Sequence, residues 1–400
     1  MSLNFVDFKK IIKDTSKEIS AIIDGSVISD SEAFQKAAKA LNALEDKLEK
    51  EEFTVGVVGV FNSGKSTFLN AMMGREILST FILPETAAIT KLTHGESESA
   101  EVTYWDKNEW VKIKADAEAK RSQDPSVITA VEESEQKLGS TLKNILTTPA
   151  HTRQVSLSEL ADFTAKQGDH SAFVREVELK VDLDFCKDSI SIVDTPGLND
   201  PVQLREIITR DYFLPKCDLI IFLVSASQAF TKFDEDFLID QTKRGQLNKL
   251  FLVVNKIDQL NNAKEQEAVV KFAQKSAFTA IDRGLAQVAP DRRDNLRVDS
   301  VETFPISASQ ALMHRCPSEG ETPRLSIEES GMNAFEDRLR KFLFEGERAH
   351  AIILNFTSLL NQGVFATLQA ALGAHQFSTD DLEEIKTKIT KQTKDLEYAQ

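Results

Sequence analysis

A glycine-bounded segment in the first fifth of the chain constrains the fold more than any other feature. It reads Gly59-Val60-Phe61-Asn62-Ser63-Gly64-Lys65-Ser66-Thr67, after an apolar run at residues 53–58 and before a helix-like stretch at residues 68–73. A strand, a G-x-x-x-x-G-K-S turn and a helix, in this order, make a phosphate-binding P-loop. The glycines let backbone N–H groups turn toward a polyphosphate, and the helix adds its positive N-terminal end. The segment therefore predicts a nucleoside triphosphate site.

The side chains of this segment have distinct expected roles. Lys65 is expected to reach the β- and γ-phosphates and to act in catalysis, and the Ser66 hydroxyl is expected to ligate Mg²⁺. The remaining predicted nucleotide contacts in the segment are Gly59, Asn62, Ser63, Gly64 and Thr67.

The loop that follows the P-loop helix supplies a further candidate metal ligand. Residues 82–92 begin as a loop and become strand-like. A threonine on a mobile loop at this distance past a P-loop commonly ligates Mg²⁺ and senses the γ-phosphate. Thr86 is our choice for this catalytic and metal-binding role. Thr90 is the weaker alternative, because its position falls within the predicted strand.

A second phosphate element follows a predicted strand pair. Residues 174–181 alternate polar and apolar, as a half-exposed edge strand would, and the apolar residues 190–193 lead into Asp194-Thr195-Pro196-Gly197. An apolar strand followed by D-x-x-G is the second phosphate element of a GTPase. Asp194 is expected to hold Mg²⁺ through its water shell, and the Gly197 amide is expected to reach the γ-phosphate.

A third motif selects the base. Two apolar runs, residues 217–224 and 250–254, read as buried strands of a parallel sheet, and the second ends in Asn255-Lys256-Ile257-Asp258. The Asp258 carboxylate can accept from the N1–H and exocyclic amine of guanine, a donor pair that adenine lacks. Asn255 would support the opposite edge and Lys256 would pack along the base. After another strand, Ser307 and Ala308 are placed to contact the base through backbone N–H groups.

Composition narrows the class of protein further. A chain of 400 residues with 41% hydrophobic content can build more than one domain, and its formal net charge of -15 argues against a broad grip on nucleic acid. Its three scattered cysteines have no metal-ligand spacing and read as reduced thiols. No signal-peptide region opens the chain. We expect a soluble, cytoplasmic protein.

Helical patterns flank the nucleotide motifs on both sides. Amphipathic helices are expected over residues 4–24 and from Ser31 to Leu48, and the pattern is helical again from Gly331 onward. No charged residue lies between Arg348 and Asp380, so that stretch is either a helix buried in a bundle, which its polar amides favour, or a membrane-seeking helix. No helix-stop signal precedes Gln400, which is what a chain cut from a longer protein would show.

The segment from residue 95 to residue 172 is polar and reads as an excursion from the nucleotide fold. It contains a predicted helix from Pro125 to Leu146 and two tryptophans, Trp105 and Trp110. Tryptophans in such a setting are more often packing anchors than binding platforms, so packing is the favoured interpretation.

Taken together, these motifs resemble one family. The stretches Gly59 to Ala71, Pro84-Glu85-Thr86-Ala87, Asp194 to Asp200 and Asn255 to Asp258 are similar to those of bacterial dynamin-like GTPases, relatives of dynamins and mitofusins. The resemblance implies an α/β fold, with a P-loop GTPase domain over residues 51–345 built on a mixed, mostly parallel sheet flanked by helices. It implies that residues 1–50 and 346–400 form a helical neck or stalk bundle.

Two departures from Ras-like GTPases bear on mechanism. Leu198 follows the D-T-P-G motif where Ras-like enzymes carry a water-orienting glutamine, and the sequence identifies no arginine finger. In relatives that are activated by dimerisation, a monovalent cation takes the place of the finger, bound partly by the residue three before the P-loop lysine. That residue is Asn62 here, which predicts K⁺ as an activating ion. The alternative is that Asn62 only hydrogen-bonds within its loop.

The resemblance also implies the partners. We expect binding of GTP and GDP, a GTP-dependent dimer formed through the GTPase domain, and peripheral action on the inner face of a membrane, which the protein would remodel or tether. A GTP-gated switch or scaffold that controls a partner without membrane remodelling is the alternative. An RNA-associated GTPase is a second alternative, but no basic segment with interleaved aromatic residues supports it.

Overall fold

The computed structural model describes most of the chain between residues 32 and 348. The described residues are 32–60, 62–78, 89–119, 125–160, 173–195, 213–244, 247, 249–288, 301–317, 322–345 and 347–348, with isolated positions at 10, 13, 17, 20, 163, 209, 351, 352, 355, 359 and 364. The chain divides into two compact units. The larger consists of Thr54–Pro290 and Val298–Arg340, and the smaller of Met1–Phe53, Asp291–Arg297 and Lys341–Gln400.

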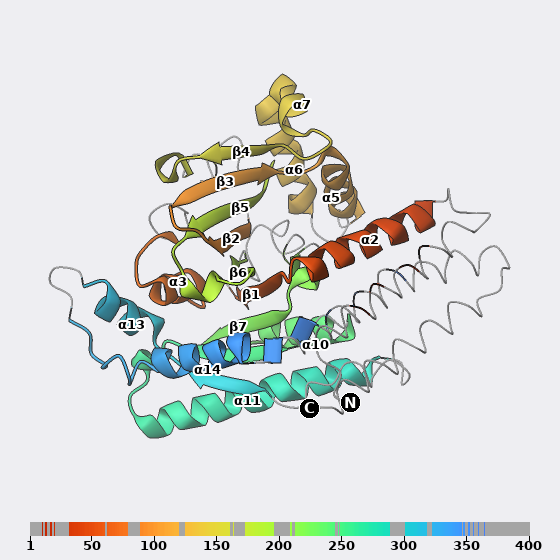
Figure 1. The fold of residues 1–400 in the computed structure, drawn as a ribbon. Coiled ribbons are helices and arrows are strands. Elements are labelled where there is room, and N and C mark those ends of the chain that lie inside the picture. The colour runs from red at the N-terminus through yellow and green to blue at the C-terminus, as the bar shows by residue number, and fades with distance from the viewer. Residues whose placement is uncertain are drawn as a thin grey trace. The chain divides into compact units, whose positions relative to one another are not determined.

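A nine-stranded mixed sheet forms the centre of the larger unit (Figure 1). Its strands, in spatial order, are β4 (Thr152–Val155), β3 (Ser99–Tyr104), β5 (Val174–Val181), β2 (Ile89–His94), β6 (Ile190–Asp194), β1 (Phe53–Gly59), β7 (Leu219–Ser225), β8 (Leu250–Asn255) and β9 (Glu302–Pro305). The pairs β1/β7, β7/β8, β8/β9 and β2/β5 are parallel, whereas β2/β6, β3/β5 and β3/β4 are antiparallel. The predicted mixed α/β fold is confirmed.

Helices of the larger unit pack in pairs beside this sheet. Helix α3 (Lys65–Met73) lies beside α13 (Ala308–Arg315), and α10 (Lys232–Lys243) lies beside α11 (Ala263–Ala286) (Figure 1). Helix α14 (Met332–Phe344) follows α13 in the chain and runs from the larger unit into the smaller. Short 3₁₀ turns occupy Asp184–Cys186, Leu214–Lys216 and Ile257–Gln259.

The most completely buried strands are β7 and β8, which the two apolar runs predicted. Every residue of β7 and of β8 is buried, because both strands lie inside the sheet with parallel partners on each side. Parallel strands covered on both faces are expected to be continuously apolar. Their burial places the strand ends, which carry the polar motif residues, at one edge of a rigid core.

The prediction of an edge strand over residues 174–181 is wrong. Strand β5 lies between β3 and β2, inside the sheet. Its alternating polar side chains are accommodated by polar neighbours on the same sheet face, as where the Thr93 hydroxyl donates to Glu178 at 2.8 Å. Alternating polar and apolar residues indicate that one face of a strand is partly exposed, but they do not indicate whether the strand has neighbours on both sides.

The excursion at residues 95–172 extends the sheet rather than leaving it. It contributes β3, α5 (Lys107–Ala119), α6 (Pro125–Leu138), α7 (Leu142–Ile145), β4 and 3₁₀ turns at Gly139–Thr141 and Leu157–Glu159. The helix predicted from Pro125 to Leu146 is thus interrupted at Gly139, whose φ is +49°. Trp105 and Trp110 are buried, and the ring of Trp110 lies 4.8 Å from that of Phe173. The interpretation of both tryptophans as packing anchors is confirmed.

In the smaller unit, α2 (Glu32–Glu49) buries part of the stripe that its periodicity predicted at Phe34, Ala38, Leu41, Leu44 and Leu48. Leu41 and Leu44 are buried, whereas Ala38 is only half-buried and its neighbour Ala37 is buried. The ring of Phe53 lies 6.0 Å from that of Phe342, and the Arg348 guanidinium lies 5.7 Å from the same Phe53 ring. Most of the expected helix over residues 4–24, and most of the uncharged stretch after Arg348, lie outside the described residues. Within the described part of the chain, no helix has the length and apolarity needed to cross a membrane.

The core of the larger unit depends on an aromatic cluster around Phe335 of α14. Its fully buried ring lies 5.3 Å from those of Phe68 and Phe304 and 6.4 Å from that of Phe251. Phe335→Ala should lower the free energy of unfolding by about 3–5 kcal/mol, because the substitution leaves a cavity among these rings. Urea unfolding followed by tryptophan fluorescence measures the change.

The matched control is Phe272→Ala on α11, whose side chain is 54% exposed and should change the free energy of unfolding by less than about 0.5 kcal/mol. Equal unfolding midpoints for the two variants would contradict the assignment of Phe335 to the core.

Candidate functional site

The predicted motif residues converge where β1, β6, β8 and β9 end. The P-loop leaves β1 at Gly59, where an added Cβ would lie 2.4 Å from the Leu223 carbonyl oxygen of β7 and 2.7 Å from Ser63 Oγ. Only glycine fits so close to the neighbouring strand. At the other end of the loop, Gly64 has a φ of +92° and caps α3. The two ends of the loop therefore have the close approach and the left-handed backbone that require glycine.

Lys65 and Ser66 open α3 and face the end of β6. The Lys65 Nζ donates to the carbonyl oxygens of Gly59 at 2.9 Å and Val60 at 3.4 Å, so its ammonium group lies against the loop. The Ser66 hydroxyl donates to Asp194 Oδ2 at 3.3 Å. Thr67 follows on the same helix and is half-buried. The structure thus brings together the phosphate lysine and both described candidates for the metal site.

Asp194 carries the most unusual electrostatics of the site. Its Oδ1 is buried and has no hydrogen-bond partner among the described residues. Burial raises the pKa of the carboxyl group to about 6, although the Lys65 ammonium and the Ser66 hydroxyl act in the opposite direction. A buried carboxylate oxygen without a donor is poorly stabilised by the protein alone, and a hard divalent cation would supply the missing charge. The donor set therefore fits Mg²⁺.

The other predicted phosphate residues are only partly placed by the structure. Thr86 and Gly197 lie outside the described residues. Thr90 lies in β2, as predicted, where it is buried and registers opposite Asp194 on β6. Neighbouring Thr195 anchors the end of β6 to β1 by donating its hydroxyl to the Val57 carbonyl oxygen at 2.9 Å.

Asn255 joins the P-loop to the two segments that are predicted to bind the base, residues 255–258 and residues 307–308, which together are called the base loop. Its side-chain Nδ2 donates to the Ser63 carbonyl oxygen at 2.9 Å, and its Oδ1 accepts from the backbone N–H of Ala308 at 3.1 Å and of Lys256 at 2.8 Å. The side chain is buried and its amide is satisfied at both ends. Asn255 therefore fixes three segments of the site to one another.

The remaining base-motif residues also contact one another. Lys256 has a left-handed φ of +69°, and its Nζ donates to the Asn62 carbonyl oxygen at 2.6 Å. The Ser307 hydroxyl donates to Asp258 Oδ1 and also caps α13. The two motifs are thus in direct contact across 194 positions of the sequence. The Asn62 side chain is exposed at the loop, where φ is +65°.

The structure adds one residue that the sequence reasoning had not singled out. Asn70 of α3 is buried, and its Oδ1 accepts from the backbone N–H groups of Ile77 at 3.1 Å and Leu78 at 2.9 Å. It thereby fixes the start of the segment that leads to Thr86. The only available signal was a polar residue inside an otherwise apolar helix stretch.

Comparison with known proteins agrees with this geometry. The model of the dynamin family matches residues 55–257. Dynamin-like protein 1 of Campylobacter jejuni is 31% identical over 349 residues, which is 86% of this chain and 44% of the relative. The bacterial dynamin-like protein of Nostoc punctiforme is 24% identical over 373 residues, or 92% of this chain and 48% of the relative.

The chain is also similar to solved structures of bacterial dynamins. The structure of an oligomerised bacterial dynamin pair, described as providing a mechanism for the long-range sensing and tethering of membranes, matches with a TM-score of 0.56 and 27% identity. The match covers 97% of this chain and 50% of that one. The chain spans about half the length of these relatives.

Gly64 tests the geometry of the P-loop. In Gly64→Ala the added Cβ would lie 2.4 Å from Asn255 Nδ2, so the substitution should displace the bridging amide and abolish binding of a fluorescent guanine nucleotide. Gly74→Ala at the other end of α3 has a similar φ of +68° but meets nothing within 4 Å. This control bears only the left-handed backbone strain of about 1–2 kcal/mol. Equal nucleotide affinity in the two variants would contradict the assignment.

Asp194 should make stability depend on pH and on metal. Its folded-state pKa of about 6 exceeds the ordinary value of 3.8, so its contribution to stability is full below 3.8 and is lost as pH rises through about 6. In EDTA near neutral pH, Asp194→Asn should therefore melt at a higher temperature than the wild type. Added Mg²⁺ should stabilise only the wild type. Melting temperatures from about pH 4.5 to about pH 8 test this. A constant difference between the two proteins would contradict it.

Proposed function

This chain belongs to the dynamin family, and from that premise we propose that it binds GTP with Mg²⁺ and hydrolyses it. The observation that carries the proposal is the Asn255 side chain, which bonds the P-loop at Ser63 and the base loop at Ala308 at once. A phosphate loop alone would be compatible with many nucleotides. Its direct attachment to an N-K-x-D loop supports a guanine nucleotide that extends across both.

We infer the following roles on the phosphate side. Lys65, which bonds the loop carbonyls, would exchange these bonds for bonds to the β- and γ-phosphates when a nucleotide provides a stronger acceptor. Ser66 and Asp194 would hold Mg²⁺, with Thr86 as a further ligand, and the Gly197 amide would bond the γ-phosphate. Bound Mg²⁺ would neutralise charge on the phosphate oxygens.

On the base side, Asp258 would accept from the guanine N1–H and exocyclic amine. The Ser307 hydroxyl, which bonds Asp258 Oδ1, orients that carboxylate. Lys256 would lie along the base plane, since its ammonium group is held at the Asn62 carbonyl oxygen. The backbone N–H groups of Ser307 and Ala308 lie at the start of α13, where the helix dipole favours an acceptor such as the guanine carbonyl oxygen. They already donate to the Ser330 carbonyl oxygen at 2.7 Å and to Asn255 Oδ1 at 3.1 Å, so the guanine oxygen would have to share or replace one of these bonds.

Stabilising the negative charge of the transition state requires a further group. Leu198 offers no side-chain amide to orient water, and the P-loop offers Asn62 at the position from which relatives bind a monovalent cation. We propose that Asn62 helps to bind K⁺ and that a second copy of the chain completes the site. Charge stabilisation at this step is commonly the largest catalytic contribution, so its absence in the monomer would leave a slow enzyme.

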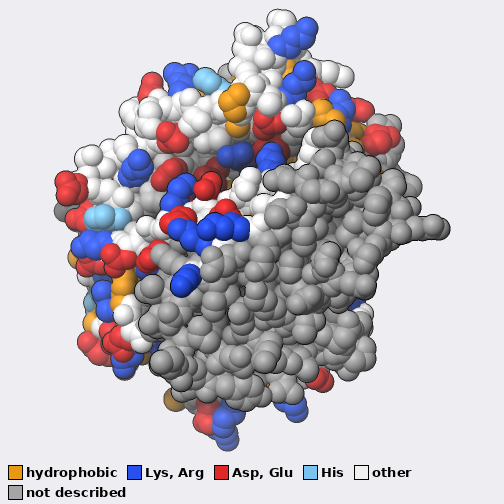
Figure 2. Space-filling model, turned by 45° about the vertical axis from the view of Figure 1, so that its right-hand side comes forward, with side chains coloured by type: hydrophobic (Ala, Val, Ile, Leu, Met, Phe, Trp, Pro, Cys, Tyr) orange, Lys and Arg blue, Asp and Glu red, His pale blue; other side chains and the backbone are white. Residues whose placement is uncertain are grey.

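The wider function we propose is membrane remodelling or tethering by a peripheral protein. Residues 51–345 would be the GTPase domain, and residues 1–50 and 346–400 a helical neck, a division that the two compact units support. The tethering of membranes described for the bacterial dynamin pair supports the membrane role. On the described part of the face drawn in Figure 2, basic and acidic side chains are interspersed, which does not favour a nucleic-acid partner at this part of the surface. A GTP-gated switch is the alternative.

GTP turnover per molecule should rise with protein concentration in K⁺ buffer, because dimerisation would complete the active site. Replacing K⁺ by Na⁺ at equal ionic strength should lower the turnover by about tenfold or more, as removal of one charge-stabilising group does elsewhere. ATP should not be turned over, because Asp258 has no donor pair to accept from on adenine. Phosphate release measures all three.

A slow rate that is independent of concentration would favour the switch and remove the mechanochemical claim. Equal rates in K⁺ and Na⁺ would reject the role of Asn62 while leaving the GTP site intact.

A further inference from the structure

Two neighbouring helices begin at the nucleotide site, one at each half of it. Helix α3 starts after Gly64 at the phosphate loop, and α13 starts after Ser307 at the base loop. The Asn255 side-chain amide joins the N-terminal ends of the two helices, because it bonds the Ser63 carbonyl oxygen and the Ala308 N–H. The two helices lie side by side (Figure 1). The spacing of the two halves of the site therefore depends on how these helices are held together.

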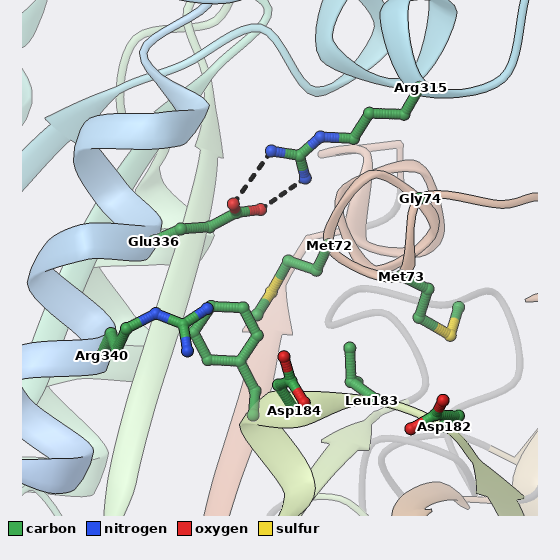
Figure 3. A pocket seen from close by; sticks show the side chains of 10 residues that line it. Met72, Met73, Gly74, Asp182, Leu183, Asp184, Arg315, Glu336 and Arg340 are labelled. Atoms are coloured by element: carbon green, nitrogen blue, oxygen red, sulfur yellow. Dashed lines mark hydrogen bonds and ion pairs between the residues drawn. The ribbon is translucent and has the colours of Figure 1, made fainter.

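Arg315, the last residue of α13, joins the opposite ends of the same helices. Its Nη1 donates at 2.5 Å both to the Ala71 carbonyl oxygen, in the final turn of α3, and to Glu336 Oε1 on α14. Its Nη2 donates to Glu336 Oε2 at 2.9 Å and to Asn333 Oδ1 at 3.2 Å. Figure 3 shows the paired bonds between Arg315 and Glu336 beside the end of α3. One guanidinium thus holds three helices.

A cavity of about 370 Å³ lies beside this junction (Figure 3). It separates Gly74, at the end of α3, from Asp184 on the neighbouring turn and from Arg340 on α14. Beside the cavity, polar bonds contribute to holding the end of α3, namely those of Arg315 and one from Cys316 Sγ to the Gly74 carbonyl oxygen at 3.2 Å.

We propose that Arg315 is a positioning residue of the nucleotide site, and this rests on the proposed function. Asn255 sets the spacing of α3 and α13 where they begin, and Arg315 sets it where they end. Together they fix the distance and orientation between the phosphate half and the base half of the site, which must match one nucleotide bound to both. We call this relation the register of the site. Glu336 anchors the guanidinium to α14, so α14 contributes to nucleotide binding without touching the nucleotide.

The chemistry of the junction favours arginine. A planar guanidinium has donors enough to bind the two Glu336 oxygens, Asn333 and the Ala71 carbonyl at once, whereas a lysine ammonium is a compact point charge. The side chains of Arg315 and Glu336 are only 21% and 15% exposed, so water competes weakly for these bonds. The positive charge also lies at the negative, C-terminal end of α3.

A register role predicts a specific binding pattern. GDP occupies both halves of the site, whereas guanosine probes the base half and pyrophosphate the phosphate half. A linked ligand gains affinity from the fixed geometry of its two subsites, and separate fragments do not. Loss of register should therefore weaken GDP and spare both fragments. General damage to either half would weaken the matching fragment as well.

The experiment compares the wild-type chain of 400 residues with Arg315→Gln and Arg315→Lys. Inhibition constants for GDP, guanosine and pyrophosphate are measured by competition against a fluorescent GDP analogue. The GDP constant should rise about tenfold in both variants, as small displacements far from the ligand can cause, with the fragment constants within about twofold of wild type. Arg315→Lys keeps the charge and serves if Arg315→Gln does not fold.

The matched control is Arg338→Gln on α14, the helix that carries Glu336. Arg338 makes the same kind of bidentate pair, with Glu302 of β9 at 2.7 and 2.9 Å, and is 25% exposed. All three constants should stay near wild type in this variant. Unchanged GDP affinity in the Arg315 variants, fragments weakened as much as GDP, or an equal loss in Arg338→Gln would each overturn the inference. A wild-type chain that binds no GDP would instead refute the proposed function.

Discussion

The buried side-chain amide of Asn255 is the interaction on which the rest of the site depends. Both ends of the amide are satisfied, by the Ser63 carbonyl oxygen on one side and by two backbone N–H groups on the other. A buried amide left without partners costs free energy, so the three loops must close around it together. This requires β1, β8 and β9 to end at the same edge of the sheet, which their parallel order achieves.

The electrostatics of the candidate metal site follow from the same enclosure. Asp194 ends a strand inside the sheet, so burial raises its pKa to about 6 even with Lys65 and Ser66 nearby. The carboxylate is therefore least stable in the conditions under which it would be most useful as a ligand. Such a group binds a cation strongly because the cation relieves a cost that the fold has already imposed. Stability of the fold and readiness of the site are opposed at this one residue.

Much of this arrangement could be predicted because the motifs are local. A strand, a turn and a helix that are contiguous in the chain place Gly59, Lys65 and Ser66 by themselves, and apolar runs predicted the buried strands β7 and β8. The edge-strand prediction for residues 174–181 failed because alternation describes one strand's faces and carries no information about its neighbours. The helix predicted through Leu146 failed at Gly139 for a local reason, a left-handed backbone that a periodicity argument overlooks.

The sequence by itself determined the P-loop segment, the place of the N-K-x-D motif at a strand end and the buried strands with polar ends, since each of these depends on residues within a few positions of one another. Only the tertiary structure decided which distant groups meet. Lys256 contacts Asn62 across 194 positions, and Arg315 contacts Ala71 across 244. No spacing rule links such pairs, because their distance is set by the order of strands in the sheet and by the packing of α3, α13 and α14. Short motifs therefore identify the residues with suitable side chains, whereas the topology of the fold sets which distant residues they contact.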